Sequence, residues 1–277
     1  MTDLARLLTL LDIETIDDDL YRGQTSIGER TRVYGGQVAA QALVAAGRTV
    51  GDDRFVHSLH AYFMRPGDPS IPIVYDVDRL RDGRSFTTRR VRARQRGKAI
   101  FTLEASFHVI EPDGLFHQPV APTLADPASL PRMSTLAEEG GTSSGWGELL
   151  ALDFRVQATD GTDPEAPTVY WFRASGEVGP DPLVHAAIIT YASDFTLLSN
   201  ILTRHGRWFG DEDLMIASLD HAMWFHQPKP DAGHWMLYET TSPAAGGSRG
   251  LGFGRIYDQD GTLLVSTAQE GLARLID

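Results

Sequence analysis

One acidic residue, Asp194, stands inside an apolar run from 191 to 202, and a carboxylate in that setting could act as a general base. Burial between Phe195 and Leu198 would disfavour the charged form and raise the pKa of the carboxyl group, which suits a group that takes up a proton near neutral pH. In the alternative interpretation Asp194, preceded by Ser193, only caps a helix. The residues around Asp194 allow both interpretations.

A long internal repeat offers a second way to find chemically active residues. Tyr34-Gly35-Gly36-Gln37 and Tyr191-Ala192-Ser193-Asp194 both stand in apolar runs, and they lie 157 residues apart. Further matched pairs follow at offsets of 160, 162 and 164 residues: Ser58 with Ser218, Pro66 with Pro228, and Gly97 with Gly261. Offsets that rise slowly and in order indicate a duplicated domain with small loop insertions.

Each copy predicts the same elements, namely a short strand, a long apolar helix and several further strands. The helices are expected at 35–48 and 183–202. Strands are expected at 20–24, 73–77, 87–94 and 99–109, and again at 169–174, 235–239, 251–257 and 263–269. A mostly apolar helix followed by an antiparallel sheet is typical of an α+β unit in which the sheet wraps around the helix.

The chain is expected to divide into an N-terminal unit at 1–110 and a C-terminal unit at 168–277. Residues 111–167 are rich in proline and are expected to connect them. With 277 residues, of which 42% are hydrophobic and 22% charged, the chain can bury a large core.

Composition excludes several classes of function. The net charge of −12 argues against a nucleic-acid partner, which would need basic patches to neutralise phosphates. The absence of cysteine excludes disulfides, thiolate metal sites and cysteine nucleophiles. No signal peptide is recognisable, and no stretch approaches the ~18 apolar residues of a membrane span, so we expect a cytoplasmic protein.

Two other groups of residues have chemical and structural interpretations. Gly246–Gly250 fits the G-x-S-x-G pattern of a hydrolase nucleophile, but an alternating strand pattern follows it where that motif requires a helix, so a hairpin loop is expected. Arg249 in this loop could meet a ligand phosphate or be solvated. His57 could line a pocket or fill the core, and the histidine spacing does not match a zinc site.

Eight arginines between 79 and 96 form the strong positive cluster of this acidic protein: Arg79, Arg81, Arg84, Arg89, Arg90, Arg92, Arg94 and Arg96. Positions 90, 92, 94 and 96 alternate and are therefore expected on one face of a strand. A solvated face paired with nearby acids is the default expectation, and capture of an anionic ligand or a subunit contact is the alternative.

Both copies resemble the acyl-CoA thioesterase II family. The resemblance lies in residues 32–37, 56–63, 80–86 and 105–107 of the first copy and in 191–194, 219–226 and 259–271 of the second. It implies a double hotdog fold, two helix-in-sheet units on one chain, and hydrolysis of medium- to long-chain fatty acyl-CoA without a metal, a cofactor or a covalent intermediate. By analogy it also implies a homo-oligomer, either a dimer or a tetramer.

The active site of that family holds an aspartate, a hydroxyl residue and a glutamine, and the resemblance assigns these places to Asp194, Ser218 and Gln269. A thioester carbonyl is weakly stabilised and a thiolate leaves readily, so an oriented water can suffice as the nucleophile. Ser218 and Gln269 would donate hydrogen bonds that fix the direction of the water or the carboxylate. Bacterial members often have threonine in place of Ser218, and serine resembles the peroxisomal branch.

The repeat separately predicts a single site, in the second copy. At the offsets above, the matched pairs are Asp194 with Gln37, Ser218 with Ser58, and Gln269 with Ala105. The first copy would therefore retain a hydroxyl but lack the carboxylate and the amide.

The helix start around Gly36 has two interpretations. Glycines there could offer backbone N–H donors to the oxyanion of a tetrahedral intermediate, or they could only permit close helix packing. Gln37 next to them is expected near the interface of the two units, as a weak candidate for substrate contact.

Two alternative functions stay open. A non-catalytic acyl-CoA-binding protein would tolerate loss of Asp194 or Gln269, and both are present. A hotdog enoyl-CoA hydratase usually has an aspartate–histidine pair, and no histidine stands beside Asp194.

Overall fold

The computed structural model describes residues 2–25, 31–111, 114–133, 135, 150–156 and 166–276. The first half forms α1 (Asp3–Leu11), β1 (Glu14–Asp17), β2 (Leu20–Gly23), α2 (Gly35–Gly47), β3 (Arg54–Phe63), β4 (Ile73–Asp82), β5 (Phe86–Gln95) and β6 (Lys98–Val109). The rest forms the 3-10 helix η1 (Pro127–Ser129), β7 (Leu152–Val156), β8 (Thr168–Ala174), α4 (Pro182–Thr196), α5 (Ser199–Thr203), β9 (Leu214–Ser218), β10 (Asp220–Phe225), β11 (Met236–Gly246), β12 (Arg249–Tyr257) and β13 (Leu263–Leu275).

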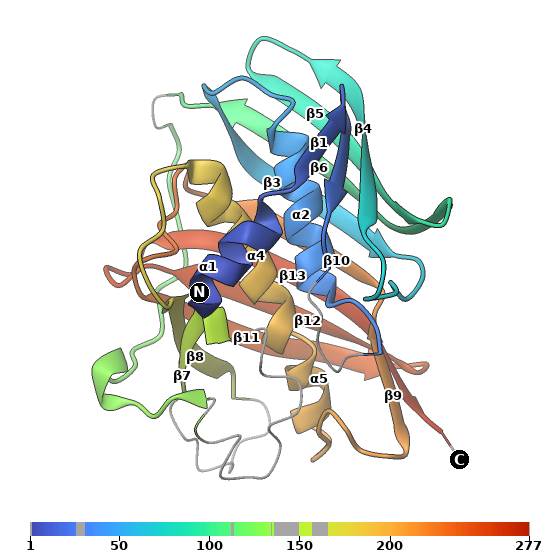
Figure 1. The fold of residues 1–277 in the computed structure, drawn as a ribbon. Helices are drawn as coiled ribbons and strands as arrows, with labels where there is room; N and C mark the ends of the chain where they lie inside the picture. The colour runs from blue at the N-terminus through green and yellow to red at the C-terminus, as the bar shows by residue number, and fades with distance from the viewer. Residues whose placement is uncertain are drawn as a thin grey trace.

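These strands form one antiparallel sheet that curves around α2 and α4 (Figure 1). Its order is β1-β2-β4-β5-β6-β3-β10-β13-β12-β11-β8-β7, and β9 pairs with β13 outside this path. The first half contributes β2-β4-β5-β6-β3 and the second contributes β8-β11-β12-β13-β10, so the two halves repeat one strand order. They meet where β3 pairs with β10. The predicted α+β double hotdog fold is confirmed.

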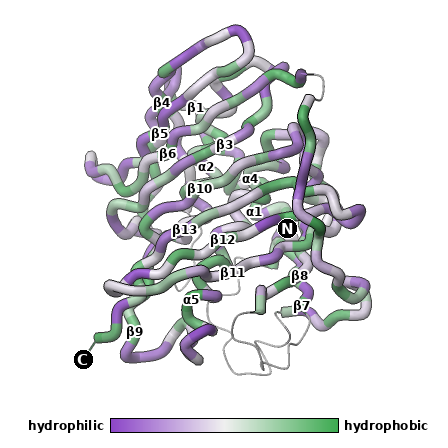
Figure 2. Tube along the Cα trace, turned by 180° about the vertical axis from the view of Figure 1, so that it is seen from behind, coloured by the Kyte–Doolittle hydropathy of each residue, from purple (hydrophilic) through white to green (hydrophobic). Residues whose placement is uncertain are grey.

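The two central helices are buried because the sheet and the other helix cover them. In α2 every residue from Gly36 to Ala46 is buried. Most of these side chains are small, so strands can approach the helix closely. The start of α4 is fixed by Asp181, whose side chain accepts a hydrogen bond from the backbone N–H of Leu183, and by proline at 182. Figure 2 views the molecule from behind, with the strands in front of both helices.

The single helix predicted at 183–202 is interrupted, since α4 ends at Thr196 and α5 begins at Ser199. Buried Asn200 ties α5 to two strands, because its side chain accepts a hydrogen bond of 2.6 Å from the Thr168 hydroxyl and donates one to the Thr240 hydroxyl. Periodicity could not reveal this interruption, which depends on contacts with distant strands.

The segment expected as a connector, 111–167, holds a strand of the sheet. Residues 152–156 form β7, which pairs with β8 in antiparallel register. An earlier part of the segment packs on the side of the sheet away from α4, where Ala121, Leu124 and Leu130 contact a buried cluster around Trp171. Residues 136–149 and 157–165 of the expected connector lie outside the described residues.

The N-terminal helix α1 packs against both central helices through its buried residues Leu4, Leu7 and Leu11. Its C-terminal turn is tied to α2 by Gln41, whose side-chain amide donates to the carbonyl of Leu10 at 2.7 Å. No helix in the described part of the chain is long and apolar enough to cross a membrane.

Candidate active site

The structure brings together the three residues assigned by resemblance. Asp194 lies in the last turn of α4, and the residue is 9% exposed. Its Oδ1 accepts a hydrogen bond of 2.6 Å from Nε2 of Gln269 and a longer one of 3.4 Å from the hydroxyl of Ser218. One carboxylate oxygen is thus held by an amide from β13 and a hydroxyl from β9.

A kink between β9 and β10 places Ser218. The peptide of Leu219 is held on both sides, because its N–H donates to the carbonyl of Glu270 and its carbonyl accepts from the N–H of Phe63, both at 2.9 Å. Asp220 completes the kink by accepting the backbone N–H of Glu270 at 2.6 Å. The sequence analysis did not predict this structural role of Asp220.

Gln269 is fully buried on the face of β13 that points to the helices. Its amide nitrogen is used by Asp194, whereas its amide oxygen Oε1 has no hydrogen-bond partner among the described residues. A buried acceptor without a donor is costly unless a ligand or a water molecule satisfies it. A hydrogen-bond donor that reached this oxygen would also lie beside the carboxylate of Asp194.

The start of α2 forms the opposite wall of the site. A β-carbon on Gly35 would lie 2.8 Å from Oδ2 of Asp194, and one on Gly36 would lie 2.5 Å from the carbonyl oxygen of Tyr191. Gly36 therefore permits the close crossing of the two helices, as one of its two interpretations proposed. Gly35, the other glycine of this helix start, is the residue that faces the carboxylate.

Electrostatic effects on Asp194 oppose one another. Burial disfavours its negative charge, whereas two donated hydrogen bonds and the positive end of the α2 dipole favour it. A residue that only caps a helix would not need to be buried, to accept two side-chain hydrogen bonds and to face the start of another helix. The capping interpretation therefore does not account for the surroundings of Asp194.

The other predicted substrate contacts have different partners. The side-chain amide of Gln37 donates to the carbonyl of Gln24 at 3.1 Å. His57 is half-buried on β3, with Nε2 2.8 Å from the hydroxyl of Ser106, and burial together with His108 lowers its pKa. Arg249 donates to Glu270 at 2.9 Å. Neither His57 nor Arg249 hydrogen-bonds to Asp194 or to its two partners.

The segment Gly246–Gly250 is the expected hairpin loop and not a nucleophile elbow. It joins β11 to β12, and both Gly247 and Ser248 have positive φ angles, of 59° and 60°. A strand follows Ser248 where the nucleophile motif requires a helix.

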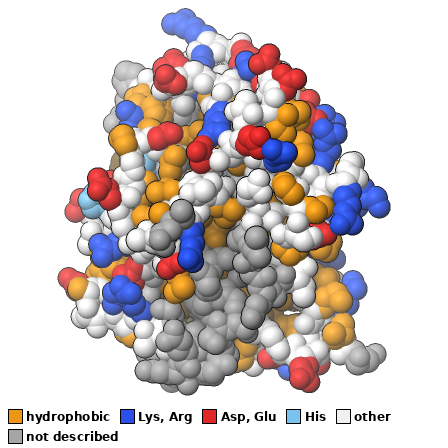
Figure 3. All heavy atoms as spheres, in the orientation of Figure 1, with side chains coloured by type: hydrophobic (Ala, Val, Ile, Leu, Met, Phe, Trp, Pro, Cys, Tyr) orange, Lys and Arg blue, Asp and Glu red, His pale blue; other side chains and the backbone are white. Residues whose placement is uncertain are grey.

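The arginine cluster is paired with acids, as the default expectation proposed. Arg90 pairs with Glu104, while Arg92 and Arg94 both reach Asp76. In Figure 3 basic and acidic side chains are interspersed over the upper part of the molecule, where β4 and β5 lie. These ion pairs leave little reason to assign an anionic ligand to the three arginines.

The strand registers and helix ends correct the matched pairs derived from the repeat. Both units contain a bulge, between Val56 and Ser58 in β3 and between β9 and β10 in the second unit. Matching the bulges sets Ser218 against Val56 and not against Ser58. Asp194 lies two residues before the end of α4, and matching the ends of the two helices sets it against Ala45, two residues before the end of α2; matching their starts sets it against Gly47.

The similar residues that follow Tyr34 and Tyr191 led to a wrong alignment of the two helices. These tyrosines lie at opposite ends of their helices and contact each other, with ring centroids 5.0 Å apart and a hydrogen bond from the Tyr34 hydroxyl to the carbonyl of Tyr191 at 2.7 Å. Gln269 still matches Ala105, so the first unit carries small or apolar residues at all three places. The prediction of one site in the second unit gains support from this corrected alignment.

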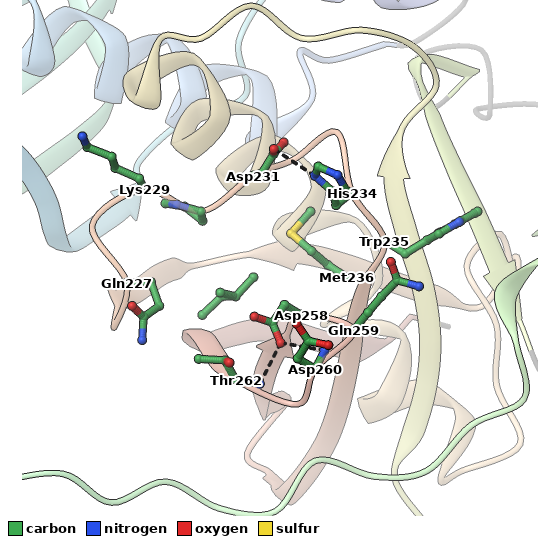
Figure 4. A pocket seen from close by; sticks show the side chains of 12 residues that line it. Gln227, Lys229, Asp231, His234, Trp235, Met236, Asp258, Gln259, Asp260 and Thr262 are labelled. Atoms are coloured by element: carbon green, nitrogen blue, oxygen red, sulfur yellow. Dashed lines mark hydrogen bonds and ion pairs between the residues drawn. The ribbon is translucent and has the colours of Figure 1, made fainter.

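A separate hollow lies at the turns that join β10 to β11 and β12 to β13 (Figure 4). It is lined by Lys229, Asp231, His234, Trp235 and eight further residues, none of which is Asp194, Ser218 or Gln269. Three or more His, Asp or Glu side chains that could share a metal ion are not found together in the described residues.

Two family models match the chain. The model described as "Acyl-CoA thioesterase" matches residues 152–272, and the model described as "Acyl-CoA thioesterase N-terminal domain" matches residues 25–108. Among curated proteins, human acyl-coenzyme A thioesterase 8 is 41% identical over 99% of this chain and 91% of its own length. Acyl-CoA thioesterase 2 of Haemophilus influenzae is 37% identical over 98% of each chain.

Solved structures are similar as well. Acyl-CoA thioesterase II TesB2 from Mycobacterium marinum has a TM-score of 0.81 and 38% identity, covering 97% of this chain and 98% of that one. The tesB protein of Mycobacterium avium subspecies paratuberculosis has a TM-score of 0.85 and 30% identity, covering 99% and 100%.

Proposed function

The chain belongs to the acyl-CoA thioesterase family, and we propose that it hydrolyses fatty acyl-CoA to the free acid and CoA with Asp194 as the general base. The single observation that carries this proposal is the buried hydrogen bond of 2.6 Å between Gln269 and Asp194. It places an oriented carboxylate next to a buried amide oxygen that still needs a donor.

A water molecule bound between these groups would be oriented for attack. One of its hydrogens would be donated to the carboxylate of Asp194 and the other to Oε1 of Gln269, which leaves an oxygen lone pair for the thioester carbonyl carbon. The water proton passes to Asp194 as the new C–O bond forms. Collapse of the tetrahedral intermediate breaks the C–S bond, and the departing thiolate of CoA takes the proton back from Asp194.

The negative charge that develops on the carbonyl oxygen needs preorganised donors. We assign this role to backbone N–H groups at the start of α2, because a β-carbon on Gly35 would reach the carboxylate and the first N–H groups of a helix have no partner within the helix. Gly36 belongs to the same turn. The first unit would thus supply the oxyanion donors and the second unit the base.

A thiol-release assay tests the proposal. Pure protein is incubated with palmitoyl-CoA and a thiol-detecting reagent, and with an enoyl-CoA whose ultraviolet absorbance is followed. Release of free thiol that is lost in Asp194→Asn supports the hydrolase. Loss of enoyl absorbance without thiol release would indicate a hydratase, and binding without either change would indicate a carrier protein.

Substrate length, assembly and location remain proposals. We propose medium- to long-chain substrates. Measuring kcat/KM for acyl-CoA esters of increasing chain length tests this proposal.

Homo-oligomer formation is supported by exposed Tyr62, Trp224 and Phe253 on the sheet face away from the helices, and sedimentation velocity tests it. A cytoplasmic location is supported by the cysteine-free, acidic composition, and fluorescence microscopy of a tagged chain tests it.

A further inference from the structure

A fully buried histidine, His221, stands beside Gln269 in the wall of the site. The register of β10 and β13 pairs Ala222 with Ala268, and its continuation by one residue sets His221 opposite Gln269. Both side chains are fully buried on the face that points to α4. Gln269 holds Asp194, and Nε2 of His221 lies 2.8 Å from the hydroxyl of Ser193, the residue before the base.

Ser193 is held from several strands at once. Its hydroxyl contacts His221 of β10, and its carbonyl accepts a hydrogen bond of 3.2 Å from the hydroxyl of Tyr238 on β11. Tyr238 in turn lies 2.9 Å from the hydroxyl of Thr267 on β13. Three strands therefore fix the backbone and side chain of a residue that touches no substrate but adjoins the general base.

The hydrogen bonds define which nitrogen of His221 carries its proton. The Ser193 hydroxyl has one proton, which it donates to the carbonyl of Thr190 at 2.9 Å, as serine hydroxyls in helices do. We assign the hydroxyl proton to Thr190 and not to Nε2 of His221 or to the sulfur of Met223 at 3.4 Å, so Ser193 accepts from His221 and Nε2 carries the ring proton. Nδ1 is left as a buried acceptor without a partner among the described residues.

This environment disfavours the charged form of His221. A second proton on Nδ1 would be a buried donor with no acceptor, which is costly. Burial is the dominant effect and lowers the pKa of His221 below 6.5, although the charges of Asp194 on α4 and Asp220 on its own strand act in the opposite direction. The facing residues on β3 and β13 are uncharged, namely Ala61 and Gln269.

We propose that His221 is a positioning residue for thioester hydrolysis, whose neutral imidazole clamps Ser193 and so fixes the last turn of α4 with Asp194 facing Gln269 and Ser218. The proposal rests on the proposed function of Asp194. The clamp acts near the end of α4, which ends two residues after Asp194 and is separated from α5 by Leu197 and Leu198. Misplacement of a catalytic group by about 1 Å can cost about 100-fold in rate, whereas substrate binding elsewhere is unaffected.

Three variants separate positioning from simple core filling. His221→Phe keeps the bulk but removes the donor, and we expect kcat to fall about tenfold or more with KM within about twofold of wild type. His221→Gln retains an N–H donor of similar reach and is expected to restore kcat to within about threefold of wild type. Ser193→Ala removes the other partner with little change in volume and should lower kcat as His221→Phe does.

His226 provides a matched control. Its Nε2 lies 2.9 Å from the hydroxyl of Ser266, a similar contact between a histidine and a serine, but the pair lies outside the site. His226→Gln should leave kcat unchanged. A His221→Phe enzyme with wild-type kcat, or a His221→Gln enzyme as slow as His221→Phe, would overturn the positioning role.

A spectroscopic measurement tests the inference without relying on turnover. In protein labelled with ¹⁵N-histidine, the His221 signals should report a neutral ring protonated at Nε2 above about pH 6.5, because burial lowers the pKa of His221 from that value. A charged ring, or a proton on Nδ1, would contradict the proposed clamp even if the enzyme is active. Absence of thiol release by the wild-type protein would instead contradict the proposed function. The NMR result would still show whether His221 donates a hydrogen bond to Ser193.

Discussion

A β-carbon on Gly35 would lie 2.8 Å from Oδ2 of Asp194, so the first residue of α2 contacts the carboxylate at the end of α4. The two residues come from different units of the duplicated chain. In the proposed mechanism, their proximity makes the one base depend on both halves of the chain. The second unit supplies the polar side chains, and the first unit supplies a helix start without side chains in the way.

Gly35→Ala should therefore lower kcat by about 10- to 100-fold, because the added methyl group displaces the carboxylate from Gln269. Steady-state assays with palmitoyl-CoA measure this loss. Gly179→Ala is the matched control, since a β-carbon there meets no atom within 4 Å and should leave the rate unchanged. Equal rates in both variants would show that the helix start and the carboxylate do not need their close contact.

Substitutions of the three polar residues should form a graded series. Asp194→Asn should lower kcat by about 100- to 10,000-fold, the range typical of a lost general base, with little change in melting temperature. Gln269→Ala should cost more than Ser218→Ala, because the amide lies 2.6 Å from Oδ1 and the hydroxyl 3.4 Å. Comparable kcat values for Asp194→Asn and wild type would reject the base, and the opposite order of the other two would reject the proposed geometry.

Much of the fold could be predicted from the sequence because its signals are local. The apolar runs gave the positions of both central helices, and Asp-Gly at 82–83 and 260–261 lies at turns between paired strands. The strand β7 was missed, because Leu152–Val156 lies within a proline-rich stretch and its pairing with β8 is not a local property.

The site was predicted less completely, for a related reason. Resemblance assigned Asp194, Ser218 and Gln269, and the structure brings them together. The contact between His221 and Ser193 depends on the register of β10 and on the rotation of α4, neither of which a sequence pattern reports. The repeat analysis matched Ser58 with Ser218 because it compared residue types and offsets along the sequence. The structural alignment depends instead on a bulge in each unit.

A single substrate should bind per chain. The first unit has Ala45, Val56 and Ala105 where the second has its polar residues, so it offers no carboxylate to a second water. Isothermal titration with a non-hydrolysable thioether analogue of palmitoyl-CoA should give one site per chain. Asp194→Asn should retain that stoichiometry while losing turnover, and two sites of similar affinity would contradict the assignment.

Buried Arg89 should contribute to stability and not to catalysis. It is 1% exposed, and its guanidinium donates to Asp82, to the hydroxyl and carbonyl of Thr49 and to the carbonyl of Arg81. Arg89→Leu leaves these acceptors without a donor and should lower the free energy of unfolding by about 2 to 4 kcal/mol in urea titrations, with kcat nearly unchanged.

The neighbouring Arg90 is the control for that variant. Its ion pair with Glu104 is close to half exposed on both sides, so Arg90→Leu should cost less than about 1 kcal/mol. Equal destabilisation by the two substitutions would mean that the hydrogen bonds of Arg89 do not stabilise the end of α2.

Protein stability in acid should depend on His221. Burial lowers its pKa in the folded protein from 6.5, so below about pH 6.5 the unfolded chain binds a proton that the folded chain does not. The free energy of unfolding therefore falls as the pH falls, by at most about 1.4 kcal/mol per pH unit for one such group. This stability is fully present above pH 6.5 and is lost toward the folded pKa. Urea titrations at several pH values between about 5 and 7.5 should show that the free energy of unfolding falls less toward acid pH for His221→Gln than for wild type. If it fell equally with pH in the two proteins, the folded state would not exclude the proton from His221.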